Sequence, residues 1–128
     1  MRIFCFLSLL ILLASCKKDD NTQGLNSSCI QVKNGNIYNV NYLGMMDGAR
    51  FDVICKFPDG CMFINGVTEE RKGQDVNITV VVGNNACGPC VETTTTQSIT
   101  YIFNPPAPGT YYLKWKGIDN RTDTIKIR

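Results

Sequence analysis

Gln-Asp-Val-Asn-Ile-Thr-Val-Val-Val, at residues 74–82, is the stretch that decides the fold class of this 128-residue chain. Every second residue in it is aliphatic, and the polar residues Asn77 and Thr79 stand between aliphatic ones. Because successive side chains of a β-strand point to opposite faces, this alternation predicts a half-buried strand. The face that we expect to be buried consists of Val76, Ile78, Val80 and Val82.

Shorter segments on both sides of this strand alternate with the same period of two. They span residues 38–42, 51–57, 99–103, 111–116 and 124–128. Turn-forming Gly, Asn, Asp and Pro residues separate them, and no helical periodicity of useful length follows residue 16. Roughly seven to eight short strands predict an all-β fold, an antiparallel β-sandwich, with a small closed β-barrel as the alternative.

Three polar segments between these strands carry specific expectations. Asp59-Gly60 lies between two apolar runs and predicts a tight hairpin over residues 51–64. Residues 69–73 mix both charges and end in Gly73, which predicts a solvated turn between strands. The threonine run at residues 93–96 predicts an exposed or edge strand.

The composition excludes several classes of chemistry. With 44% hydrophobic and 19% charged residues, the chain is expected to be globular. It contains no histidine, which excludes Ser-His-Asp and Cys-His catalytic units and histidine-ligated zinc or haem. The formal net charge of +2 gives no broad electrostatic reason to expect nucleic acid as a partner. No carboxylates stand out as a catalytic pair, so we expect no catalytic residue, no metal and no cofactor.

The first residues of the chain have the pattern of an export signal. Arg2 precedes an almost wholly apolar run at residues 3–14, which suits a signal peptide and is too short to cross a bilayer. Leu13-Ala14-Ser15-Cys16 follows at once and resembles a bacterial lipobox. The resemblance implies cleavage before Cys16, whose sulfur then carries diacylglycerol and whose new amine is acylated. An ordinary secretory signal followed by an incidental cysteine is the alternative.

Three segments follow from this interpretation of the N-terminus. Residues 1–15 are the signal peptide, 16–25 the lipidated cysteine with a flexible polar tether, and 26–128 the β-sandwich domain. Cys-Lys-Lys-Asp-Asp at 16–20 resembles the start of bacteroidete-type lipoproteins. This resemblance implies the outer membrane, at its periplasmic face or at the cell surface. As a partner we expect an unknown envelope protein or glycan. A plain solvated linker explains the same residues equally well.

The C-terminal third resembles the closing strands of immunoglobulin-like domains in secreted bacterial proteins. Residues 103–115 contain the Pro-Gly-Thr-Tyr pattern that ends a loop and begins a strand in that family, and residues 123–127 supply the next strand. The resemblance implies that Tyr111, Leu113 and Trp115 face the core, with Ile125 and Ile127 beside them. It carries no information on ligands, because this sandwich serves many functions.

Of the seven cysteines, five lie in the expected domain. Export places them in an oxidising compartment, where disulfides persist. The resemblance to small sandwich lipoproteins implies a bridge between Cys61 and Cys90. A second bridge is expected from Cys87 to either Cys29 or Cys55. Because five is odd, one cysteine remains free or forms a disulfide-linked dimer or a bridge to a partner.

The chain contains the same four residues as the redox motif of thioredoxins, Cys87-Gly88-Pro89-Cys90. That motif requires a helix directly after it, whose dipole activates the first thiol. Here residues 91–97 are rich in β-branched side chains, which disfavours a helix. We therefore interpret the motif as a turn with its cysteines in disulfides, and thiol–disulfide exchange as the alternative. A zinc site built with Cys55 and Cys61 has the wrong spacing.

Asp123-Thr124-Ile125 resembles the short O-glycosylation pattern of bacteroidete-type exported proteins, which implies Thr124 as a modification site. Taken together, the sequence predicts a non-enzymatic binding or structural module that is anchored to the cell envelope through Cys16. Its ligand is not specified by any of these patterns.

Overall fold

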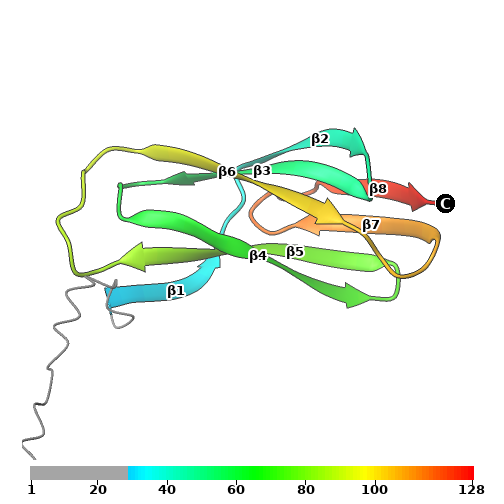
Figure 1. Cartoon of the computed structure of the whole chain (residues 1–128), viewed down its shortest axis with the longest axis horizontal. Helices are drawn as coiled ribbons and strands as arrows, with labels where there is room; N and C mark the ends of the chain where they lie inside the picture. Colours follow the sequence, from blue (N-terminus) through cyan, green and yellow to red (C-terminus); the bar gives the residue numbers. More distant parts are fainter. Residues whose placement is uncertain (1–28) are drawn as a thin grey trace, which may run out of the picture.

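The computed structural model describes residues 29–128, and in this range the chain forms a sandwich of two β-sheets without an α-helix (Figure 1). The larger sheet contains β1, β4, β5, β7 and β8, and the smaller sheet contains β2, β3 and β6. The strands are β1 (Ile30–Gly35), β2 (Asn39–Met45), β3 (Ala49–Phe57), β4 (Met62–Lys72), β5 (Asp75–Asn85), β6 (Thr95–Phe103), β7 (Gly109–Trp115) and β8 (Thr122–Ile127). The predicted all-β sandwich is confirmed, and the closed-barrel alternative is wrong.

The strand that contains residues 74–82 is the centre of the larger sheet. Val76, Ile78, Val80 and Val82 of β5 are at most 1% exposed, which confirms the predicted buried face. β4 pairs with β5 along one side. On the other side, β1 pairs with residues 80–85 and β7 with residues 75–78. The β5–β7 pairing is parallel, unlike the other strand pairings, because the chain enters β7 after crossing over from the smaller sheet.

β3 occupies the corresponding position in the smaller sheet, between β2 and β6. Its buried face meets that of β5, and the two together with β7 form most of the core. Tyr111, Leu113 and Trp115 of β7 point into this core as expected, and Tyr111 pairs with Ile125. The buried side chains of β3 are Ala49, Phe51, Val53, Cys55 and Phe57.

The hairpin predicted over residues 51–64 is wrong. β3 and β4 lie in different sheets, so the Asp59-Gly60 connection crosses the sandwich. The carboxylate of Asp59 accepts a hydrogen bond from the Cys61 amide at 2.9 Å, and the Gly60 amide donates to the Val91 carbonyl at 2.9 Å. The backbone amides of this turn thus donate to the Asp59 side chain within the turn and to the carbonyl of Val91 in a distant loop. Two alternating runs joined by Asp-Gly predict a turn, but they do not show which strands pair.

Two other local expectations also need correction. Residues 69–72 continue β4 and pair with β5, so the turn shrinks to Gly73 and Gln74, where Gly73 adopts a φ of 65°. In the segment 38–42 only Val40 is buried, because β2 is an edge strand with a bulge after Tyr42. The threonine run is only partly a strand: Thr93 and Thr94 lie in the exposed connection, and Thr95 and Thr96 begin β6, which is an edge strand of its sheet.

One long side of the sandwich is closed by side chains that join β4 to β6. The Gln97 side chain accepts from the Ile64 amide and donates to the Met62 carbonyl, both at 3.1 Å. Further along the same edge, the Tyr101 hydroxyl donates to the Glu69 carboxylate. These bonds satisfy part of the free edge of β4, so this edge is protected against pairing with another chain.

Candidate functional site

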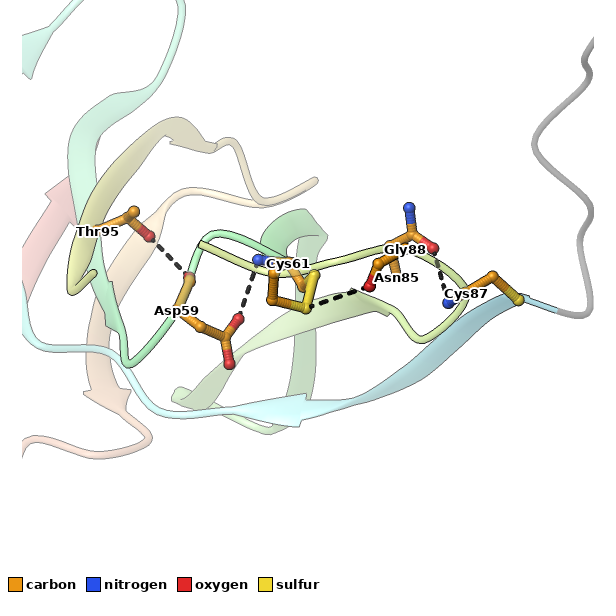
Figure 2. The surroundings of a disulfide bond; sticks show 7 residues. Asp59, Cys61, Asn85, Cys87, Gly88 and Thr95 are labelled. Atoms are coloured by element: carbon orange, nitrogen blue, oxygen red, sulfur yellow. Dashed lines mark hydrogen bonds between the residues drawn. A yellow bond between two sulfur atoms is a disulfide. The ribbon is translucent and has the colours of Figure 1, made fainter. Parts of the chain in front are cut away.

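Four of the five cysteines in the described residues meet at one end of the sandwich (Figure 2). Cys29 is bonded to Cys87, and Cys61 is bonded to Cys90, each pair with its Cα atoms 5.2 Å apart. Cys61–Cys90 is the pairing that the resemblance implies. Of the two partners left open for Cys87, the structure selects Cys29. The two bonds fasten the 86–94 connection to the start of β1 and to the crossover between β3 and β4.

Backbone and side-chain hydrogen bonds position the same connection. The Ala86 amide donates to the Cys29 carbonyl at 2.8 Å, and the Cys87 amide donates to the side-chain oxygen of Asn85 at 3.2 Å. The Thr95 hydroxyl donates to the Asp59 carbonyl at 3.2 Å. Figure 2 shows these side chains on both flanks of the Cys61 sulfur. The loop is therefore fixed by hydrogen bonds at the same places where the disulfides hold it.

The Cys87-Gly88-Pro89-Cys90 motif consequently lacks the arrangement of a redox centre. Its two sulfurs are bonded to two different segments and not to each other. The residues after it form an irregular connection and then β6, so no helix dipole acts on Cys87. This agrees with our interpretation of the motif as a turn with its cysteines in disulfides.

Cys55 is the free cysteine among residues 29–128. Its side chain is fully buried in the core face of β3, and burial raises the pKa of its thiol. A thiol reacts as the thiolate, so both effects make Cys55 unreactive in the folded domain. A disulfide-linked dimer through Cys55 would require the core to open.

This inertness can be measured in a chain whose Cys5 and Cys16 are replaced by alanine. We expect one thiol per chain to react with Ellman's reagent in denaturant, and this thiol to react many times more slowly under native conditions. Rapid native labelling, or reduction of insulin disulfides by the protein, would contradict both the disulfide assignment and a non-enzymatic role. A Cys55→Val chain, which should show no thiol in denaturant, is the control.

Asp59 lies close to the second disulfide, since one of its carboxylate oxygens and the sulfurs of Cys61 and Cys90 all lie within 4.8 Å of one another. This is the spacing of a metal site. However, the two sulfurs are bonded to each other and supply no thiolate ligands. The carboxylate instead caps the Cys61 amide, so its role here is to shape the turn.

An open pocket of about 450 Å³ adjoins the disulfides. Its lining is mainly apolar and contains Ile30, Phe63 and Pro89, together with the backbone at Gly60 and Gly88. The Phe63 ring lies over Gly83, where a Cβ atom would come within 2.3 Å of the ring. No pattern in the sequence predicts this pocket, because its walls come from separate segments that strand pairing with β5 and the two disulfides bring together.

The remaining expected site residues have different positions. Thr124 is exposed on β8, where its side chain is open to modification. The neighbouring Asp123 accepts hydrogen bonds on one carboxylate oxygen from the Trp115 indole at 2.6 Å and from Arg121 at 3.1 Å, so its carboxylate is held in place. Cys16, the signal peptide and the tether lie outside the described residues. Residues 29–128 contain no helix long and apolar enough to span a bilayer.

Comparison with known proteins agrees with this architecture. The family model of the ORF11 beta-sandwich domain matches residues 51–127, which is more than half of the chain and runs from β3 through β8. No curated protein and no solved structure matches the chain.

Proposed function

The chain belongs to the ORF11 beta-sandwich domain family, and on this fold we propose that it is a non-enzymatic binding or structural module of a bacterial cell envelope. A lipid on Cys16 anchors it to the outer membrane, at the periplasmic face or at the cell surface. Its partner is an envelope protein or a glycan. The sandwich supplies exposed strands and loops on a rigid core, which is how recognition domains of this architecture work.

The observation that carries the proposal is the state of the cysteines. Two disulfides brace one end of the sandwich, and the remaining thiol, Cys55, is buried. Such a framework belongs to an oxidising compartment outside the cytoplasm, which is the destination that the lipobox at 13–16 specifies. Two independent features of the sequence, far apart along the chain, thus support export.

The same observation favours a binding or structural role over catalysis. Both cysteines of the Cys87–Cys90 motif are occupied, and the chain has no histidine. Several polar side chains form structural contacts: Gln97 and Tyr101 join the sheets, and Asp123 accepts hydrogen bonds from Trp115 and Arg121. We therefore propose that the module acts through contacts of its surface with a partner and not through a catalytic site.

Replacing Cys16 with alanine tests the anchor. The variant is expected to incorporate no palmitate, because it lacks the cysteine that would carry the lipid. If another peptidase removes the signal peptide, the protein moves from the membrane fraction to the soluble fraction. If none does, it stays as an unprocessed precursor. Metabolic labelling with radioactive palmitate and membrane fractionation measure both outcomes. Cys5→Ala is the matched control and should leave labelling unchanged. If Cys16→Ala still incorporates palmitate, the anchor assignment is wrong.

A further inference from the structure

The two long sides of the sandwich are not equivalent. On one side, Gln97 and Tyr101 join β4 to β6 by hydrogen bonds. On the other side lie β2 and β8, and within residues 29–128 each of them pairs with one strand only, β2 with β3 and β8 with β7. Both strands therefore present an unpaired backbone edge, and these edges flank the same side of the molecule. Free edges of this kind are templates for pairing with another chain.

A groove runs between these two edges. One part, of about 370 Å³, is lined by Tyr42 and Met45 of β2, by Phe51 and by residues 123–126 of β8. The adjoining part, of about 710 Å³, is lined by Met45, by the β2–β3 turn and by residues 126–128. Met45 and Lys126 belong to both parts, so the groove continues along the whole second half of β8.

The groove has an apolar floor and exposed apolar walls. Phe51 and Ile125 form the floor and are almost completely buried, whereas Tyr42 and Met45 are each about half exposed, at 51% and 52%. Leu43 and Met46, immediately beside these residues in the chain, are also more than half exposed. A contiguous group of exposed apolar side chains at a free sheet edge marks an interaction site in a soluble domain.

The charges at the rim indicate what kind of chain fits. Lys126 and Arg128 line the groove, and neither forms an ion pair within the described residues. Of the two side-chain carboxylates that line the groove, Asp123 is paired with Arg121 and the Trp115 indole, which leaves Asp47 as the unpaired one. The rim therefore has an excess of unpaired positive charge and complements an acidic partner.

We propose that this groove binds an extended peptide segment of a partner protein, in which apolar side chains alternate with acidic ones. The segment adds as a strand to the free edge of β8, its apolar side chains cover Tyr42 and Met45, and its carboxylates face Lys126 and Arg128. The six residues of β8, Thr122–Ile127, present about 20 Å of strand, enough for a six-residue segment. The inference rests on the proposed role as a binding module, and it is independent of the lipid anchor.

The groove lies away from the disulfide-braced end. In Figure 1 the start of β1 lies at one end of the sandwich, and β8 runs toward the other end, where the chain terminates. Cys29, next to β1, is the first described residue and follows the proposed tether. A module held from that end presents the groove outward, with room for a partner.

The test uses the full-length protein, purified from membranes in mild detergent, and a phage library of random twelve-residue peptides as the probe. Peptides are selected on the wild type and counter-selected on a Met45→Glu/Lys126→Glu variant. We expect the recovered peptides to alternate apolar and acidic residues and to bind the groove variant at least about tenfold more weakly. Lys33→Glu, an exposed charge reversal on β1, should leave binding unchanged.

Two further measurements make the outcome decisive. Proline introduced at alternate positions of a recovered peptide should abolish binding, because proline cannot donate to a strand ladder. Circular dichroism of the groove variant must match the wild type, which separates lost binding from lost folding.

Failure to recover any peptide that prefers the wild type overturns the proposal. So does a concentration-dependent dimer, seen by sedimentation and abolished by the same substitutions, since the occupant is then a second copy. Neither result bears on palmitate labelling, which tests the anchor separately.

Discussion

Replacing Cys61 and Cys90 together with alanine is expected to lower the free energy of unfolding by about 3–4 kcal/mol. The bond closes a sequence separation of 29 residues, and its loss restores the conformational freedom of that loop to the unfolded chain. The Cys29–Cys87 bond closes a separation of 58 residues, for which the chain-entropy model gives about 4 kcal/mol. The total free energy of unfolding of domains of this size is roughly 5–15 kcal/mol. A chain that lacks both bonds should therefore be largely unfolded at 37 °C.

The measurement is urea unfolding followed by tryptophan fluorescence, since the chain has one tryptophan and it is buried in the core. The variants are made in a chain with Cys5 and Cys16 replaced by alanine, so that no freed thiol can form a new bridge. Cys55→Ala in the same background removes a buried thiol without removing a crosslink. A reductant should destabilise the parent chain and leave the variant without disulfides unchanged. Equal urea midpoints for the parent and the Cys61/Cys90 variant would show that this bond does not form.

The alternation of apolar side chains predicted the buried face of the central strand β5, but not that of residues 38–42, where only Val40 is buried. It identified the inward residues of β5, because the period of two depends only on local backbone geometry, and the family resemblance added those of β7. It did not identify strand partners. Asp59-Gly60 is compatible with a hairpin and with a crossover between sheets, and the choice depends on hydrogen bonds from Gly60 to Val91 and from Thr95 to Asp59, which are more than 30 residues apart in sequence.

The cysteine pairing was also only partly predictable from the sequence, although one pattern in the sequence favoured Cys29 over Cys55 as the partner of Cys87. Cys55 alternates with Val53 and Phe57 on the apolar face of its strand. A side chain on that face points into the core, away from loops at the ends of the sandwich, so Cys55 was the poorer partner for Cys87. The groove between β2 and β8 had no comparable signal. It arises because two edge strands from different sheets face each other, and this follows from topology alone.

Phe51→Ala is expected to lower the free energy of unfolding by about 3–5 kcal/mol, which corresponds to a fall in melting temperature of roughly 15–30 °C for a domain of this size. Phe51 has no exposed surface and lies at the centre of an aromatic cluster. Its ring centroid is 5.0 Å from that of Trp115 and 5.3 Å from that of Tyr42. Truncation removes these contacts and leaves a cavity between the two sheets, where paired strands cannot move inward to fill it.

Tyr42→Ala and Phe51→Leu are the matched comparisons for this prediction. Tyr42 touches the same ring from the exposed side, so its removal should cost only about 1 kcal/mol, the value of one aromatic pair. Leucine retains much of the buried volume of Phe51 and should cost less than alanine, about 1–2 kcal/mol. If all three variants lost the same stability, Phe51 would act only as a groove wall, as Tyr42 does. A much larger loss for Phe51→Ala than for the other two variants would instead identify Phe51 as the centre of the core beneath the groove. A peptide bound above it would then meet side chains that the packed core holds in place, with little ordering cost on the protein side.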